Sequence, residues 1–197
     1  MENRILRPTV SEVANSAVQN GLRSAGLILA GSSLVAVCSH IALPLWFTPV
    51  PLTLQPFAVL LLGLLLGPQL AAATLFAYLL EGAVGLPVFA PGLGFGAGLA
   101  HLLGPTGGYL LSYPAAAALV AFLRRKLPHG FSGALMSAAA GDVVILLCGM
   151  AWLAALTHSS VPSAFALAVL PFLPGDALKV VGAAGIAKGL DRVRRRD

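Results

Sequence analysis

The sequence contains no Asp, Glu, Lys or Arg between Ser24 and Leu80, and this run constrains the fold more than any other feature. Three further charge-free runs follow, over residues 82–123, 127–141 and 143–175. A helix that crosses a membrane needs about 20 consecutive apolar residues, so these runs together have room for several crossings. The positions of the charges therefore predict a protein that crosses a membrane several times.

The composition excludes the main classes of soluble protein. Of the 197 residues, 58% are hydrophobic and only 10% are charged, whereas a soluble domain has roughly 25% charged residues. A soluble globule of this length could not bury so much apolar surface. The net charge of +5 does not indicate a nucleic-acid partner, because the positive residues cluster at the ends of apolar runs rather than along one surface.

Proline and glycine divide the apolar runs into six predicted membrane helices, at residues 24–45, 52 or 57 to 67, 69–86, 107–123, 133–156 and 164–187. Four prolines between Pro44 and Pro56 exclude a regular helix from the first connection, and the connection 87–103 is rich in glycine. We expect these irregular connections to line a cavity, because backbone polar groups at a membrane need partners. The predicted fold is an all-α integral membrane protein, a six-helix bundle with outer loops that roof a ligand cavity.

The basic residues predict the orientation of the bundle. They form three clusters, before the first helix, after the fourth and after the sixth. With six crossings all three clusters lie on one side, which the positive-inside rule assigns to the cytoplasm. We therefore expect a multi-pass protein of a bacterial or archaeal cell membrane, with both termini cytoplasmic. Residues 1–23 would form a tail or an interfacial helix, 24–188 the lipid-embedded domain and 189–197 a basic tail.

Four ionisable side chains inside the predicted helices are the first candidates for a functional site, because such groups are costly in a membrane. They are Glu81, Asp142, Asp176 and Lys179. Asp176 and Lys179 share one helix face, where they either neutralise each other or hold the polar groups of a ligand. Asp142 lies far from the outer loops, so we expect it to have a structural or partner-facing role.

Small residues indicate where helices pack closely. The pairs Gly63 and Gly67, and Gly185 and Gly189, have the spacing of such contacts. The first helix carries a small-residue face that would dock another membrane protein or pack within the bundle: Gly26, Ala30, Ser32, Ser33 and Ala36. No His or Cys spacing typical of a metal site is present, so no metal is expected.

Four motifs of the chain resemble the BioY family, the biotin-binding S components of energy-coupling factor (ECF) vitamin transporters. They are PVPLTLQPF (49–57), YLLEGAVGLPVFA (78–90), LGPTGGY (103–109) and LPGDALK (173–179). The resemblance covers the chain from residue 25 to residue 187 and implies biotin uptake by a protein that is not an enzyme. It also implies two kinds of partner, a transmembrane coupling (T) protein and ATP-binding A subunits. No cofactor would bind this chain, and ATP would act only through those subunits.

The same resemblance implies a biotin site near the outer face. Asp176 would accept hydrogen bonds from the ureido N–H groups, and Lys179 would pair with the carboxylate or hold the polar end. Three further polar side chains would complete the head-group contacts: Tyr78, Glu81 and Gln55. The rings and alkyl chain of biotin need apolar walls, which three aromatic residues could supply: Trp46, Phe47 and Phe89.

Two other functions remain as alternatives, an intramembrane aspartyl protease and an autonomous small-molecule carrier. The protease would use Asp142 and Asp176, but the predicted topology places these carboxylates at different depths, where they could not share a proton. ATP hydrolysis by this chain is not expected, because the sequence has no phosphate-binding motif Gly-x4-Gly-Lys-Ser/Thr. The sequence leaves open whether the chain forms a homo-oligomer.

Overall fold

The computed structural model describes residues 10–91 and 97–194, with side chains from residue 18 to residue 193 within those ranges. The described part is mostly helical, which agrees with the predicted all-α class. Its helices are α1 (Val10–His40), α2 (Gln55–Leu65), α3 (Pro68–Ala83), α4 (Leu99–Leu102), α5 (Gly107–Lys126), α6 (Phe131–Thr157), α7 (Val161–Ala168) and α8 (Leu173–Arg194). Two short strands accompany them, β1 (Ala42–Leu43) and β2 (Leu52–Thr53).

The lengths of the helices identify two or three membrane spans among the described residues. Val18–His40 of α1 and the whole of α6 are long and apolar enough to cross a membrane, and the bent pair of α7 and α8 would make a third span. Helix α2 is apolar but has only 11 residues, which corresponds to about 16 Å at 1.5 Å per residue. The chain is therefore a helical membrane protein.

Two helix boundaries differ from those predicted. The single helix expected over 164–187 is two helices, α7 and α8, whose axes are bent by 55°. Pro171 and Pro174 lie at this break, where a proline lacks the N–H that would continue a helix. At the other end of the chain, α1 runs unbroken from Val10 to His40, so the boundary predicted at residues 23 and 24 falls inside one helix.

The first connection is a small antiparallel hairpin, so the prediction that its prolines exclude a helix is confirmed. Ala42 pairs with Thr53 and Leu43 pairs with Leu52, and the N–H of Leu54 donates to the carbonyl of Ile41 at 3.1 Å. The hairpin ends directly at the first turn of α2. This arrangement carries the chain across one end of the bundle and back into it.

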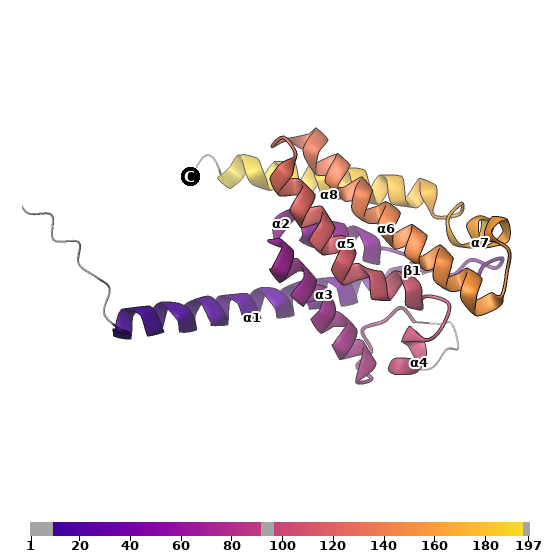
Figure 1. Cartoon of the computed structure of the whole chain (residues 1–197), viewed down its shortest axis with the longest axis horizontal. Coiled ribbons are helices and arrows are strands. Elements are labelled where there is room, and N and C mark those ends of the chain that lie inside the picture. Colours follow the sequence, from indigo (N-terminus) through magenta and orange to yellow (C-terminus); the bar gives the residue numbers. More distant parts are fainter. Residues whose placement is uncertain (1–9, 92–96, 195–197) are drawn as a thin grey trace, which may run out of the picture.

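Helix α5 is central in the bundle, since it packs against α2, α3 and α6, while α8 packs against α2 and α6. Figure 1 shows the hairpin, α4 and α7 at the right, which we call the hairpin end, and the C-terminal ends of α5 and α8 at the left. We call this second end the basic end, because the last turn of α5 carries Arg124, Arg125 and Lys126. The N-terminal part of α1 projects beyond the other helices there (Figure 1).

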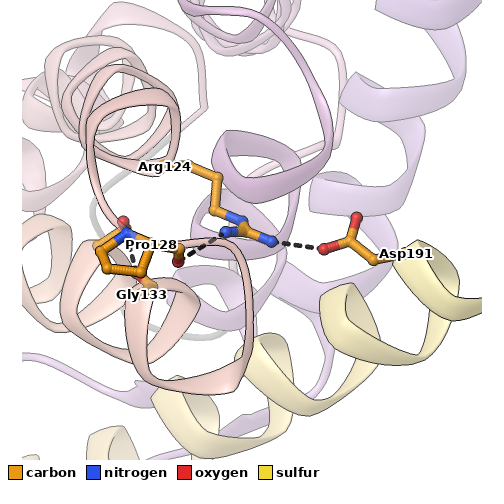
Figure 2. Close-up of polar contacts among 5 residues, drawn as sticks. Arg124, Pro128, Gly133 and Asp191 are labelled. Atoms are coloured by element: carbon orange, nitrogen blue, oxygen red, sulfur yellow. Dashed lines mark hydrogen bonds and ion pairs between the residues drawn. The ribbon is translucent and has the colours of Figure 1, made fainter.

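An ion pair joins two helices at the basic end. The guanidinium of Arg124 is buried near the end of α5, donates to the carboxylate of Asp191 on α8, and lies 3.5 Å from the carbonyl oxygen of Pro128 (Figure 2). A hydrogen bond to a charged partner is stronger than one between neutral groups. Arg124 therefore fastens α8 to both α5 and the connection between α5 and α6.

The predicted glycine contacts are confirmed at one position and wrong at another. A Cβ atom on Gly63 would lie 2.7 Å from the Cβ of Val120 and 2.9 Å from the carbonyl oxygen of Ala117, so α2 and α5 touch closely there. A Cβ atom on Gly185 or on Gly189 would meet nothing within 4 Å, so their spacing does not mark a close contact among the described residues. Spacing alone does not say which face of a helix meets a neighbour.

Replacement of Gly108 by alanine should destabilise the bundle. Its Cβ would lie 2.2 Å from the Cβ of Trp152 and 2.6 Å from the carbonyl oxygen of Cys148, and backbone atoms cannot move aside easily. We expect a loss of about 1 to 3 kcal/mol, as is typical of overpacking, measured by thermal unfolding in detergent. Gly185→Ala is the matched control, and its open surroundings predict no loss of stability. Equal effects of the two substitutions would contradict the close α5–α6 contact.

Candidate functional site

A cavity opens among the helices at the hairpin end. Its volume is about 510 Å³ when the open space at its mouth is included. Both connections contribute to its wall, the first through residues 50–56 and the second through Ala90, His101 and Thr106, together with α5, α6 and α8. Its polar lining residues are Thr53, Gln55, His101, Thr106, Tyr109, Tyr113, Asp176 and Lys179. The non-helical backbone of these connections thus lines a cavity. This agrees with the rule that such backbone in a membrane protein needs partners for its N–H and C=O groups, which lipid cannot supply.

A buried ion pair lies in the cavity wall. The Nζ of Lys179 donates to Oδ1 of Asp176 at 2.7 Å, and the two residues are only 8% and 3% exposed. Asp176 lies in the first turn of α8, where the positive end of the helix dipole favours a carboxylate. Because α8 begins at the break after α7, the first turn of a helix, rather than its middle, faces the cavity. The structure therefore brings together the two residues that the sequence had singled out as a pair.

Gln55 lies in the wall because a chain of hydrogen bonds holds it there. Its Nε2 donates to the hydroxyl of Tyr78 at 2.6 Å, and that hydroxyl donates to the carbonyl oxygen of Val88 at 2.9 Å. The hydroxyl of Thr53 lies 3.3 Å from Oε1 of Gln55. Tyr78 is fully buried and is not among the residues that line the cavity, and its hydroxyl joins Gln55 to the second connection.

Phe89 and His101 form a second layer next to this chain. Their rings stack at 5.0 Å with an angle of 25°, and Phe89 also meets the edge of Tyr78 at 5.5 Å. Phe89 is buried but not part of the cavity lining, whereas His101 is. The ring of Phe89 occupies the space that a side chain on Gly82 would need, because a Cβ there would lie 2.0 Å from the ring. Phe89 therefore supports the wall from behind.

Three of the predicted biotin contacts lie elsewhere. Trp46 is 96% exposed and Phe47 is 42% exposed, and they pack edge to face on each other outside the cavity lining. The hydroxyl of Thr48 donates to the carbonyl oxygen of Leu167, which anchors the hairpin loop on α7 next to these two rings. Glu81 accepts a hydrogen bond from Ser32 at 2.8 Å and so joins α3 to α1. It does not line the cavity.

The predicted small-residue face of α1 divides into two parts. Ser32 is buried and Ala36 packs against the core, so these two residues serve the bundle itself. The other three are exposed: Gly26, Ala30 and Ser33. A Cβ atom on Gly26 would meet nothing within 4 Å.

Asp142 is buried on α6, so of the two roles expected for it, structural or partner-facing, its burial favours the structural one. It is 7% exposed, and its Oδ1 has no hydrogen-bond partner. Asp176 is paired with Lys179, and no hydrogen bond of the described residues joins it to Asp142. An aspartyl protease needs two carboxyl groups close enough to share a proton, and the hydrogen bonds of these two residues do not form such a dyad. The described residues also contain no group of three or more His, Cys, Asp or Glu that could hold a metal ion.

Sequence reasoning did not assign several residues of the cavity wall. Tyr109 and Tyr113 are one turn apart on α5 and both line the cavity, and the hydroxyl of Tyr109 donates to the carbonyl oxygen of Ala168 at 2.5 Å. Their spacing of four residues, directly after the glycines 107 and 108, was the available signal. His101, Thr106 and Phe172 gave no such signal, because they lie in the four-residue helix α4, in the turn before α5 and at the α7–α8 break.

The fold and the site define a helical membrane protein with a small, partly polar ligand site between its helices. The sequence model of the BioY family matches residues 9–196. A probable biotin transporter BioY of Pyrococcus horikoshii is 43% identical over 142 residues, which are 72% of this chain and 81% of that protein. The biotin transporter BioY of Thermotoga maritima is 37% identical over 169 residues, 85% and 96% of the two chains.

A solved structure agrees with these sequence relatives. The crystal structure of the S-component for biotin from an ECF-type ABC transporter superposes with a TM-score of 0.79 at 25% identity, covering 88% of this chain and 93% of that one. The chain belongs to the BioY family. It is accordingly a transport protein and not an enzyme.

Removal of one partner of the buried ion pair should cost more stability than removal of both. Lys179→Met leaves the carboxylate of Asp176 buried and unpaired, so we expect a loss of about 3 to 5 kcal/mol. The double variant Asp176→Leu/Lys179→Met leaves no charge and should recover most of this loss. Thermal unfolding of the ligand-free protein measures both effects. A double variant less stable than Lys179→Met would contradict the burial of the pair.

Proposed function

We propose that this chain is the biotin-binding S component of an ECF-type transporter and that it functions in biotin uptake. The names of its relatives support this function, and so does its likeness to the S-component for biotin. The main support for this function in the chain itself is the Asp176–Lys179 pair, which lies in the wall of a cavity between helices. A buried carboxylate beside a buried ammonium suits a ligand that has both N–H donors and a carboxylate.

The chemistry of biotin matches the rest of the cavity wall. Its ureido group has two N–H donors and one carbonyl acceptor, which need partners once they leave water. Asp176 supplies an acceptor, Lys179 a donor, and Gln55 an amide held in place by Tyr78. Apolar lining residues remain for the fused rings and the alkyl chain, among them Val50, Ile145, Leu146 and Phe172. A site that pairs every polar atom of its ligand discriminates strongly against analogues that lack them.

The orientation of the bundle is part of this proposal. The C-terminal end of α1 leads into the hairpin, so the N-terminus of α1 lies at the basic end together with the ends of α5 and α8 (Figure 1). Six crossings then come from α1, α2, α3, α5, α6 and the α7–α8 pair, with the segments that flank the short helix α2 completing its crossing. The basic end faces the cytoplasm by the positive-inside rule, and the cavity faces outward in a bacterial or archaeal cell membrane.

Partner subunits complete the proposed transporter. The sequence has no phosphate-binding motif for ATP, so ATP-binding A subunits would supply the energy and no cofactor would bind this chain. The exposed small residues Gly26, Ala30 and Ser33 of α1 allow another helix to approach closely. We assign this part of α1 to the contact with the transmembrane coupling protein.

Calorimetry with the purified protein tests the ligand and the site. Biotin should bind tightly and riboflavin should not. Asp176→Asn and Lys179→Ala should each weaken biotin binding about tenfold or more, because loss of a buried hydrogen-bond partner costs about 1 to 3 kcal/mol. Unchanged affinity in both variants would contradict the assigned site. Binding of riboflavin without biotin would contradict the ligand.

Leu178→Ala is a matched control on the same helix. Leu178 lies between the two polar residues in sequence but is 76% exposed. Its truncation removes apolar surface without touching the cavity wall, so biotin affinity should stay within about twofold of the parent chain.

Reporter fusions test the orientation. Green fluorescent protein fused after residue 197 or inserted at residue 129 should fluoresce, because both positions lie at the basic end that we assign to the cytoplasm. Alkaline phosphatase inserted at residue 160, between α6 and α7, should be active because it would lie outside. Phosphatase activity of a fusion after residue 197 would contradict the cytoplasmic position of the basic end.

A further inference from the structure

The tip of the hairpin loop carries two aromatic rings that the protein leaves uncovered. Trp46 is 96% exposed, and its ring packs edge to face on that of Phe47 at 5.4 Å. Neither residue lines the cavity, and the indole N–H of Trp46 donates to no atom of the described residues. A large aromatic side chain with an unused N–H donor calls for a partner outside the chain.

The hairpin tip is fixed to α7. The hydroxyl of Thr48 donates to the carbonyl oxygen of Leu167 at 2.9 Å, and Figure 1 shows the loop beside α7 at the hairpin end. Along the chain, exposed apolar side chains continue from α7 through the break into α8: Val161, Phe165, Leu170, Leu173, Leu178 and Val181. The segments 24–80 and 143–175 contain no charged residue. The tip therefore joins an uncharged apolar surface that continues on a membrane-spanning helix.

The length of α8 gives the depth of this surface. Basic residues begin at Lys188 on α8, which marks the membrane boundary at the basic end because such groups are costly in hydrocarbon. Leu173, where α8 begins, precedes Lys188 by 15 residues, which is about 22 Å at 1.5 Å per residue. The hydrocarbon core is about 30 Å thick, so α8 begins before the opposite boundary is reached. Helix α7 and the hairpin tip fixed to it lie at that boundary.

Helix α7 has the residue pattern of such a boundary. It begins with two exposed serines, since the N-cap hydroxyl of Ser160 accepts the N–H of Ser163 at 3.5 Å. Its later exposed side chains are apolar, with Phe165 44% exposed. A short segment that changes from hydroxyl groups to apolar groups suits the transition from lipid headgroups to acyl chains.

We infer that Trp46 and Phe47 form an anchor in the interfacial layer of the bilayer at the hairpin end. The partner is lipid: the rings lie among the upper parts of the acyl chains, and the indole N–H donates to ester or phosphate oxygens of the headgroups. Through the hydrogen bond of Thr48 the same anchor holds α7 at this depth. The inference depends neither on the ligand of the cavity nor on which end faces the cytoplasm, so it can fail or succeed independently of the proposed function.

Tryptophan fluorescence of the full chain in phosphatidylcholine nanodiscs tests the anchor. The chain has two tryptophans, so the signal of Trp46 is the difference between the parent chain and Trp46→Phe. This signal should be blue-shifted from that of tryptophan in water. Bromine on the upper part of the acyl chains should quench it at least about twofold more than bromine near the chain ends, as an interfacial ring requires. A signal like that of tryptophan in water, quenched by dissolved iodide and by no brominated lipid, would overturn the inference.

Leu178→Trp in the Trp46→Phe background is the matched control for depth. Leu178 is 76% exposed on α8 and precedes Lys188 by ten residues, or about 15 Å. This distance is half of a hydrocarbon core of about 30 Å, so bromine near the chain ends should quench the new tryptophan most. Equal depth profiles at positions 178 and 46 would contradict the depths assigned along α8, and the inference with them.

Two other partners for the ring pair give different signals. A lid over the cavity would change the emission of Trp46 when biotin is added, whereas an anchor outside the cavity lining should leave it unchanged. A second copy of the chain packed on the tip would give a blue-shifted signal that no brominated lipid quenches. Either of these two results would overturn the inference.

Discussion

The buried pair of Asp176 and Lys179 is the interaction on which the rest of the site depends. Two opposite charges inside an apolar bundle are tolerated only when each has a partner, so the segments around them must hold both side chains in place. The break between α7 and α8 presents the first turn of α8 to the cavity, where the helix dipole favours Asp176. Lys179 follows one turn later on the same face.

The segments that interrupt the helices build the remainder of the wall. The proline-rich hairpin brings Thr53 and Gln55 into the bundle, and the carbonyl oxygen of Val88 fixes the hydroxyl of Tyr78 that holds Gln55. The indole of Trp152 donates to the carbonyl oxygen of Gly104, which fastens the second connection to α6. The regular helices thus span the membrane, and the non-helical segments line the ligand cavity.

Much of this arrangement follows from the sequence, because its signals are local. The charge-free runs predict the helices, the prolines predict that the first connection is not a regular helix, and a spacing of three residues predicts the pair on α8. The directions of Trp46 and Phe47 depend on how the hairpin loop is anchored on α7, which no local pattern encodes. Glu81 stands out in the sequence as an acid within an apolar run, but its partner Ser32 on α1 is distant in sequence, and no local pattern encodes this contact.

A structure of the protein with bound biotin tests the central claim most directly. The account predicts density for the ligand in the cavity at the hairpin end, with a ureido nitrogen within hydrogen-bonding distance of the carboxylate of Asp176. Biotin bound outside this cavity, or bound within it while making no contact with either member of the ion pair, would contradict the account.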